Sequence, residues 1–156
     1  MSFSIRRLLP GDAAALLAYE AVSARFEHEV AHEIDLETAA EPPDPQRIAP
    51  FLADPTVLFW LAERNGSPVG MLHCYVQRRY APSAWAELLL YEIGTHADHR
   101  RQGIGRALLD AMEDWMRATA IDVVWVPAAA TAIAFYEACG YIVDGDSDRV
   151  MSKTLV

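Results

Sequence analysis

The sequence predicts an α/β domain, and three patterns along the 156-residue chain support this fold class. An Asn-Gly pair joins two segments rich in β-branched and aromatic residues, which is a strong signal for a β-hairpin. A later segment, beginning at Gly103, carries apolar residues at helical spacing, and a short apolar strand and a second helix follow it. The length suits one compact unit, so we expect a single domain spanning residues 1–156.

The N-terminal half of the sequence is predicted to form one strand, two helices and the hairpin. The sequence Pro-Gly-Asp ends the first strand and offers Asp12 as the N-cap of the first helix. In that helix, four apolar side chains fall on one stripe: Leu16, Tyr19, Phe26 and Val30. Closely spaced prolines then exclude a helix and predict a loop. The expected elements are a strand at Phe3–Leu9, a helix from Asp12 to about Val30, a loop at Glu33–Asp44, a short helix at Gln46–Leu52 and the hairpin at Thr56–Arg79.

The C-terminal half continues the alternation of strands and helices. The helix that begins at Gly103 is amphipathic, with its apolar positions at Ile104, Ala107, Leu108, Ala111, Met112 and Trp115. The other expected elements are a strand at Trp85–Thr95, a buried strand at Asp122–Val126, a helix at Ala128–Ala138 closed by Gly140, and strand pieces at Tyr141–Val143 and Arg149–Leu155.

Composition narrows the classes of function. The formal net charge of −9 argues against a nucleic-acid binder and favours a cationic partner, although an acidic surface also serves solubility alone. The chain has no apolar run near the ~20 residues of a membrane helix and no signal-peptide pattern, so we expect a cytoplasmic protein without membrane partners. The two cysteines, Cys74 and Cys139, lie in apolar contexts and are expected to be buried thiols.

The segment EIGTHADHRRQGIGRALLDAM, from Glu92 to Met112, predicts an anion site. A strand runs through a polar turn into a helix start that contains Gly103 and Gly105 and is flanked by arginines. The first amides of a helix have no intrahelical acceptor, and the helix dipole adds partial positive charge there. Glycines let a pyrophosphate approach the backbone without a Cβ clash. An ordinary capped helix remains the alternative.

The pattern Arg-x-x-Gly-x-Gly, followed by AIAFYEACGY at Ala132–Tyr141, resembles the acetyl-CoA-binding pattern of the GNAT superfamily of N-acetyltransferases. The order of strands and helices resembles the same fold, a mixed and mostly antiparallel sheet flanked by helices. Within the superfamily, the chain looks like the small aminoglycoside 3-N-acetyltransferases. One departure is Ala129, where the family often has an asparagine near the pantetheine arm. The resemblance implies acetyl-CoA bound by Ile93, Gly94, Thr95, Arg100, Arg101, Gln102, Gly103, Ile104, Gly105 and Arg106.

Two residues are expected to carry the chemistry. An ammonium with a pKa near ~10 must lose a proton before it attacks a thioester, and Glu92 lies at the end of the central strand as the candidate base, acting directly or through water. We expect Tyr91 and Ile93 to limit its solvation and raise its pKa. An amide near Gly94 or Thr95 would stabilise the oxyanion. The resemblance places Tyr136 where GNAT enzymes have a tyrosine near the sulfur, which implies that it would protonate the leaving thiolate. The alternatives are a solvated acid and a core aromatic.

An acidic window, RFEHEVAHEIDLETAAEPPD at Arg25–Asp44, also contains His-Glu-x-x-His, the signature of zinc peptidases. We expect His28 and His32 to face away from the helix core, and the continuation lacks the extended zincin pattern, so no metal is expected. The acids instead suggest a wall that binds a polycationic amine, with a solvated helix face as the alternative. The expected acceptor-binding residues are Glu29, Glu33, Asp35, Glu37, Tyr91, Asp144 and Asp146.

Together these observations predict an acetyl-CoA-dependent N-acetyltransferase. The resemblance implies acetylation of the 3-amino group of an aminoglycoside antibiotic, and hence a resistance enzyme. Three alternatives stay open: a GNAT enzyme for a polyamine or a peptide N-terminus, a zinc hydrolase, and a non-catalytic acyl-CoA-binding module. The sequence leaves the oligomeric state open, a homodimer included.

Overall fold

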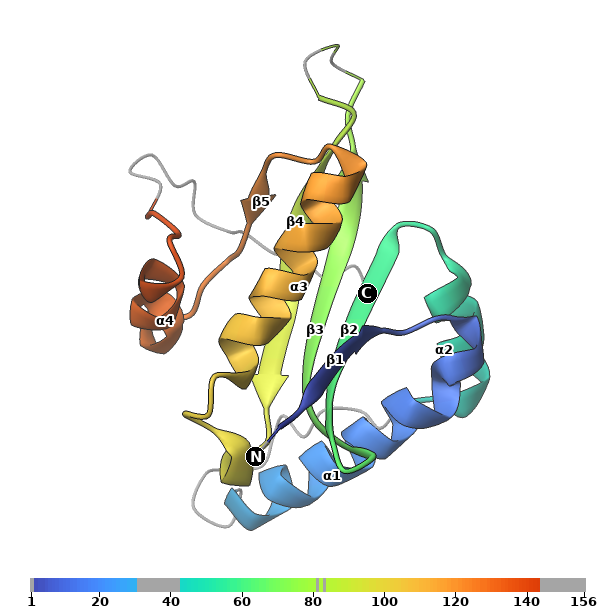
Figure 1. Cartoon of the computed structure of the whole chain (residues 1–156). Coiled ribbons are helices and arrows are strands. Elements are labelled where there is room, and N and C mark those ends of the chain that lie inside the picture. The colour runs from blue at the N-terminus through green and yellow to red at the C-terminus, as the bar shows by residue number, and fades with distance from the viewer. Residues whose placement is uncertain (1, 31–42, 81, 83, 144–156) are drawn as a thin grey trace, which may run out of the picture.

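The computed structural model describes residues 2–30, 43–80, 82 and 84–143, with the side chains of residues 24–30 outside the description. A five-stranded sheet forms the centre, in the spatial order β1-β2-β3-β4-β5 (Figure 1). Neighbouring strands are antiparallel except for β4 and β5, which are parallel. The strands are β1 (Ser4–Arg7), β2 (Val57–Arg64), β3 (Ser67–Arg78), β4 (Ala86–Thr95) and β5 (Val124–Trp125). The predicted mixed, mostly antiparallel sheet is therefore confirmed.

Local chemistry explains the central hairpin of β2 and β3. Asn65 has φ 51° and Gly66 has φ 76°, so both turn residues lie in the left-handed region that this pair tolerates best. Both strands are buried along most of their length, as their β-branched and aromatic residues predict. The hairpin therefore supplies the rigid middle of the sheet.

Helices cover both faces of the sheet, and each face has its own core. On one face, Leu108 and Met112 of α3 (Ile104–Thr119) pack with Leu58, Leu88 and Leu90 of the strands. On the other face, Leu16 and Tyr19 of α1 (Ala13–Val30) and Ile48 and Leu52 of α2 (Pro45–Ala53) pack with Phe59, Leu61 and Met71. We refer to these as the α3 face and the α1/α2 face. The short helix α4 (Ile133–Ala138) lies beyond β5 (Figure 1).

The ends of the helices follow their capping residues. The Asp44 side chain accepts a hydrogen bond from the backbone of Gln46 at 2.9 Å and starts α2. Gly103, with φ 81°, starts α3, and Gly140, with φ 89°, follows α4. The helix predicted to begin at Gly103 is confirmed, and α1 is helical as far as Val30, where the described residues pause.

Several local predictions are wrong. Asp12 does not cap α1: it ends a short 3₁₀ segment (Pro10–Asp12) and accepts hydrogen bonds from the Leu9 amide and from Arg6, both at 2.8 Å. The strand expected at 122–126 pairs only at Val124 and Trp125 among the described residues and is largely exposed. Residues 141–143 form no strand. The predicted loop at 33–44 and the strand at 149–155 fall largely or wholly outside the described residues.

The cysteines are both free, and they differ in their surroundings. Cys74 is fully buried, whereas Cys139 is only partly buried. Burial raises the pKa of the Cys74 thiol to about 12, so that it remains uncharged in the core. Within the described part of the chain, no helix has both the length and the apolar character needed to cross a bilayer.

Candidate active site

A β-bulge in β4 sets the direction of the proposed base. Along β3, His73 pairs with Glu92 and the next residue, Cys74, pairs with Leu90, so Tyr91 is an extra residue on β4. Side chains alternate faces along a strand, and regular alternation would put Glu92 on the α3 face with Leu88 and Leu90. After the bulge Ile93 takes that place, and Glu92 lines a cavity on the α1/α2 face.

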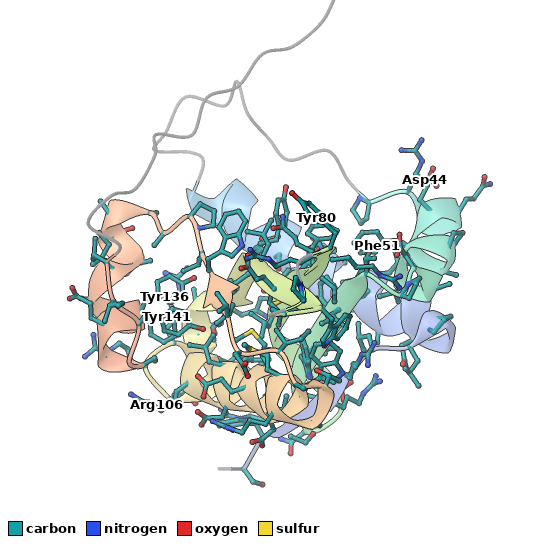
Figure 2. All side chains as sticks on the ribbon, turned by 90° about the horizontal axis from the view of Figure 1, so that it is seen from above. Asp44, Phe51, Tyr80, Arg106, Tyr136 and Tyr141 are labelled. Atoms are coloured by element: carbon teal, nitrogen blue, oxygen red, sulfur yellow. The ribbon has the colours of Figure 1, made fainter. Side chains whose placement is uncertain are left out.

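This cavity has a volume of about 280 Å³ and lies between the sheet and helices α1 and α2. Most of its wall is apolar, and the charged groups come from three elements. The lining residues are Leu16, Glu20, Pro43, Asp44, Arg47, Ile48, Phe51, Phe59, Met71, His73 and Glu92. Figure 2 shows Phe51 on the side of α2 toward the sheet and Asp44 at the outer start of that helix. Three carboxylates and one guanidinium therefore surround an apolar interior, which suits a cationic ligand with a carbon skeleton.

Tyr19 and His96 close the α1/α2 face beside the end of β4. Their rings stack at 4.6 Å with an interplanar angle of 10°, and Ser23 Oγ lies 3.1 Å from His96 Nε2. Burial raises the pKa of Tyr19 to about 12, so its hydroxyl stays protonated. A Cβ at Gly94 would lie 2.8 Å from that hydroxyl, so only glycine fits there without a shift. Gly94 thus lets α1 approach the strand that carries Glu92.

The turn between β4 and α3 presents backbone amides as predicted for an anion site. The first α-helical hydrogen bond runs from Ala107 N to Gly103 O at 3.0 Å, so the amides of residues 104–106 precede it. Arg101 has φ 61° and Gly103 has φ 81°, and these left-handed residues turn the chain into the helix. A Cβ at Gly103 would meet nothing within 4 Å, so no other part of the described chain crowds the turn at this residue. The residues present therefore fit a pyrophosphate.

Side chains around this turn hold it in place. Arg64, from the end of β2, donates to Gln102 Oε1 at 2.7 Å and lies 3.3 Å from His99 Nδ1. Gln102 in turn donates to the carbonyl of Asp98 at 3.2 Å. Sequence reasoning missed Arg64, because nothing in the turn itself signals a partner on a distant hairpin. The turn is therefore anchored to the rigid centre of the sheet.

Two predicted cofactor residues have additional structural roles. Arg106 donates to the carbonyl of Ala138 at the end of α4, so its side chain links two helices (Figure 2). A Cβ at Gly105 would lie 3.1 Å from the ring of Phe135, so a glycine favours close packing of α3 against α4. This packing gives a second reason for Gly105, beside the expected close approach of a phosphate.

The sheet opens between β4 and β5. These strands pair at Leu88 and Leu89, and within the described residues no pairing with β5 extends to Ile93–Thr95.

Tyr136 of α4 is buried on the α3 face, and the centroid of its ring lies 5.3 Å from those of Phe135 and Tyr141. Figure 2 shows the labelled Tyr136 and Tyr141 between α4 and the sheet. Burial, with Cys74 and Cys139 nearby, raises the pKa of Tyr136, so its hydroxyl stays protonated.

The remaining predicted acceptor residues separate into three groups. Tyr91 is exposed, and its ring lies 5.2 Å from that of His73. Glu29 lies in α1, but its side chain is outside the description. Five acids of the expected wall lie outside the described residues: Glu33, Asp35, Glu37, Asp144 and Asp146. The expectation that Tyr91 and Ile93 shield Glu92 is wrong, because the Glu92 side chain is exposed.

The cavity contains residues that sequence reasoning missed as site residues, notably Glu20, Phe51, Phe59 and His73. Their positions depend on the packing of α1 and α2 on the sheet and carry no local motif. No group of three or more potential metal ligands occurs among the described residues, and His28 and His32 fall outside the side chains that are described.

Comparison with known proteins identifies the family. Residues 20–141 match the Acetyltransferase (GNAT) family. The chain belongs to this family. Its members use acetyl-CoA as the acetyl donor, and an acetyltransferase from Clostridium acetobutylicum with acetyl-CoA has the same fold, with a TM-score of 0.68, 16% identity and coverage of 96% of each chain. The chain therefore has the fold and the family membership of the acetyl-CoA-dependent acetyltransferases.

Other relatives differ in their acceptors. The [ribosomal protein bS18]-alanine N-acetyltransferase of Escherichia coli K12 is 36% identical over 58 residues, and this alignment spans 35% of the present chain and 39% of that enzyme. An aminoglycoside acetyltransferase from an uncultured soil metagenomic sample, in complex with sisomicin, has a TM-score of 0.74 and 18% identity, and covers 99% of this chain and 95% of that one. The same enzyme in complex with trehalose has a TM-score of 0.80 and 19% identity, with 98% and 97% coverage. These structural similarities establish the fold.

Proposed function

We propose that this enzyme acetylates an amine of a polycationic small molecule, namely the 3-amino group of an aminoglycoside. The observation that carries the proposal is the bulge in β4, which turns Glu92 into a cavity that also contains Glu20 and Asp44. Carboxylates around an open site attract ammonium groups and disfavour neutral or anionic amines. The net charge of −9 adds to this attraction, and a structural relative is described in complex with sisomicin.

The chain's residues supply the steps of the transfer. Acetyl-CoA supplies the acetyl group as an activated thioester. Its pyrophosphate would be held by the amides that begin α3, and its pantetheine arm would lie along Ile93–Thr95, where β4 has no β5 partner among the described residues. An amide of Gly94 or Thr95 would donate a hydrogen bond to the acyl oxygen, because a fixed backbone donor needs no reorganisation.

Two side chains move protons in this scheme. Glu92 takes one proton from the acceptor ammonium, directly or through water, so that the nitrogen lone pair becomes available. Tyr136 donates its hydroxyl proton to the leaving sulfur, and the raised pKa of this buried tyrosine keeps that proton in place until it is needed. The nitrogen of the tetrahedral intermediate then loses its second proton, which returns through water to the Tyr136 oxygen and leaves a neutral amide. Glu92 lines the cavity on the α1/α2 face and Tyr136 belongs to the core of the α3 face, so acid and base act from opposite sides of the sheet.

A protein N-terminus is the second candidate acceptor. The cavity of about 280 Å³ has an apolar wall that includes Leu16, Phe59 and Met71, which would suit the first side chain of a peptide better than a polyhydroxylated ring. The E. coli relative acts on an alanine of a ribosomal protein. A single carboxylate beside the amine would serve this acceptor as well.

Release of free thiol from acetyl-CoA tests the proposal. The panel contains sisomicin, spermidine, a peptide beginning with alanine, and the same peptide with a blocked N-terminus as the matched control. We expect turnover with sisomicin, and nuclear magnetic resonance of the product should locate the acetyl group on N3. Turnover with the free peptide alone would replace the aminoglycoside with a protein N-terminus, and acetylation of another sisomicin nitrogen would overturn the regiochemistry.

A further inference from the structure

His73 is a buried histidine directly across the sheet from the proposed base. It lies on β3, pairs with Glu92 at the bulge of β4, and lines the same cavity. Its side chain is only 5% exposed. Because the two residues are paired across neighbouring strands of the sheet, the backbone holds them side by side.

The surroundings of His73 are aromatic rather than polar. Its ring centroid lies 5.3 Å from that of Phe51, 5.2 Å from Phe59, 4.5 Å from Tyr75 and 5.2 Å from Tyr91. Within the described residues, His73 Nε2 is buried and has no hydrogen-bond partner. A buried polar atom is normally paired, so an unpaired nitrogen in the wall of a cavity points to a partner that binds there.

The imidazole stays neutral near pH 7. Burial lowers its pKa to about 4, so it keeps one nitrogen that accepts and one that donates. The ionisable groups that share the cavity with His73 come from three elements: Glu20 from α1, Asp44 and Arg47 from α2, and Glu92 from β4. Two of the rings packed on His73, those of Tyr75 and Tyr91, also carry hydroxyl groups. A neutral His73 forms no ion pair with the Glu92 carboxylate.

We propose that His73 is a specificity-determining residue that binds the acceptor amine through Nε2, with the proton of the imidazole on Nδ1. This inference rests on the proposed function. A primary ammonium has three N–H bonds: Glu92 removes one proton, a second N–H donates to His73, and the freed lone pair attacks the acetyl carbon. His73 gains no proton. A hydroxyl has one hydrogen, which cannot serve both residues, so the pair selects nitrogen over oxygen on an acceptor that carries both.

Kinetics of two matched variants test this role. His73→Phe keeps a ring of similar shape and removes both nitrogens, whereas Tyr75→Phe removes a polar atom from a neighbouring ring. With sisomicin, we expect His73→Phe to raise the KM for the amine about tenfold or more and to increase the fraction of O-acetylated product. The KM for acetyl-CoA should stay within about twofold, and Tyr75→Phe should behave as wild type. An unchanged amine KM and product ratio in His73→Phe would overturn the inference.

A binding measurement separates this inference from the proposed function. In ¹⁵N-labelled protein, the Nε2 resonance of His73 should shift when sisomicin or the alanine-leading peptide is added, with or without turnover. If the wild type acetylates an amine and Nε2 does not respond, the inference fails and the proposed function survives. If Nε2 responds to an amine that is never acetylated, the proposed function fails and the binding role of His73 survives. If neither occurs, both fail.

Discussion

Replacement of Gly94 by alanine should show how tightly α1 packs against β4, the strand that carries Glu92. The new Cβ would lie 2.8 Å from the hydroxyl of Tyr19, a distance at which something must move. Tyr19 is only 6% exposed and its ring is stacked on His96 at 4.6 Å, so it has little room to retreat. Overpacking of this kind costs about 1–3 kcal/mol. At about 2 kcal/mol, the midpoint of thermal unfolding should fall by roughly 4–8 °C in a domain of this size.

A double-mutant cycle with Tyr19→Phe assigns the cost to this contact. Tyr19→Phe removes the clashing oxygen together with its hydrogen bond to Ser23, so alone it should cost about 1 kcal/mol. In the double variant the alanine should become nearly neutral, which gives a coupling of about 1–2 kcal/mol between the two changes. Urea unfolding followed by tryptophan fluorescence measures all four free energies. Additive effects, with a coupling below about 0.5 kcal/mol, would refute the reasoning.

Three further variants test separate parts of the structure. The pKa of His73 falls from 6.5 to about 4 on folding, so the unfolded chain binds its proton more readily and stability drops as pH falls through that window. Between pH 7 and pH 5, this effect should lower the free energy of unfolding of the wild type by roughly 2 kcal/mol, and urea unfolding of His73→Phe should lack that decrease. The same decrease with pH in the variant would contradict the burial argument. Gly105→Ala brings a Cβ within 3.1 Å of Phe135 and should lower the free energy of unfolding by about 1 kcal/mol. If this contact causes the decrease, adding Phe135→Leu should remove it. An equal decrease in the Phe135→Leu background would exclude the contact as the cause. Arg64→Met removes the 2.7 Å hydrogen bond to Gln102 in the turn between β4 and α3. Steady-state kinetics should show that the KM for acetyl-CoA rises roughly threefold or more while the KM for the amine is unchanged. Equal changes in both KM values would contradict a role confined to that turn.

The elements that sequence reasoning predicted well are those encoded locally. The turn at Asn65 and Gly66 needs left-handed backbone, and this pair of residues supplies it at little cost. The apolar positions of α3 repeat at helical spacing, and Ile104, Leu108 and Met112 are indeed buried. By contrast, the apolar run at 122–126 pairs over only two residues, because pairing also depends on the neighbouring strand.

The candidate site was only partly predictable for the same reason. Glu92 and the glycine turn lie within one continuous segment, so spacing alone reveals them. The bulge that turns Glu92 to the α1/α2 face depends on the register between β3 and β4, and no local residue announces it. His73 and Glu20 reach the cavity through tertiary packing, and in the sequence they look like ordinary core and surface residues.

The most direct test of the account is kcat/KM for sisomicin in Glu92→Gln. Gln keeps the size of the side chain and removes the base, and Glu87→Gln on the same strand, where Glu87 pairs with Arg79, is the matched control. Loss of a general base predicts a decrease of about 100-fold or more, largest near neutral pH where the amine is protonated, with acetyl-CoA binding retained. A value within about threefold of wild type would show that Glu92 does not take the proton, and the central claim would be wrong.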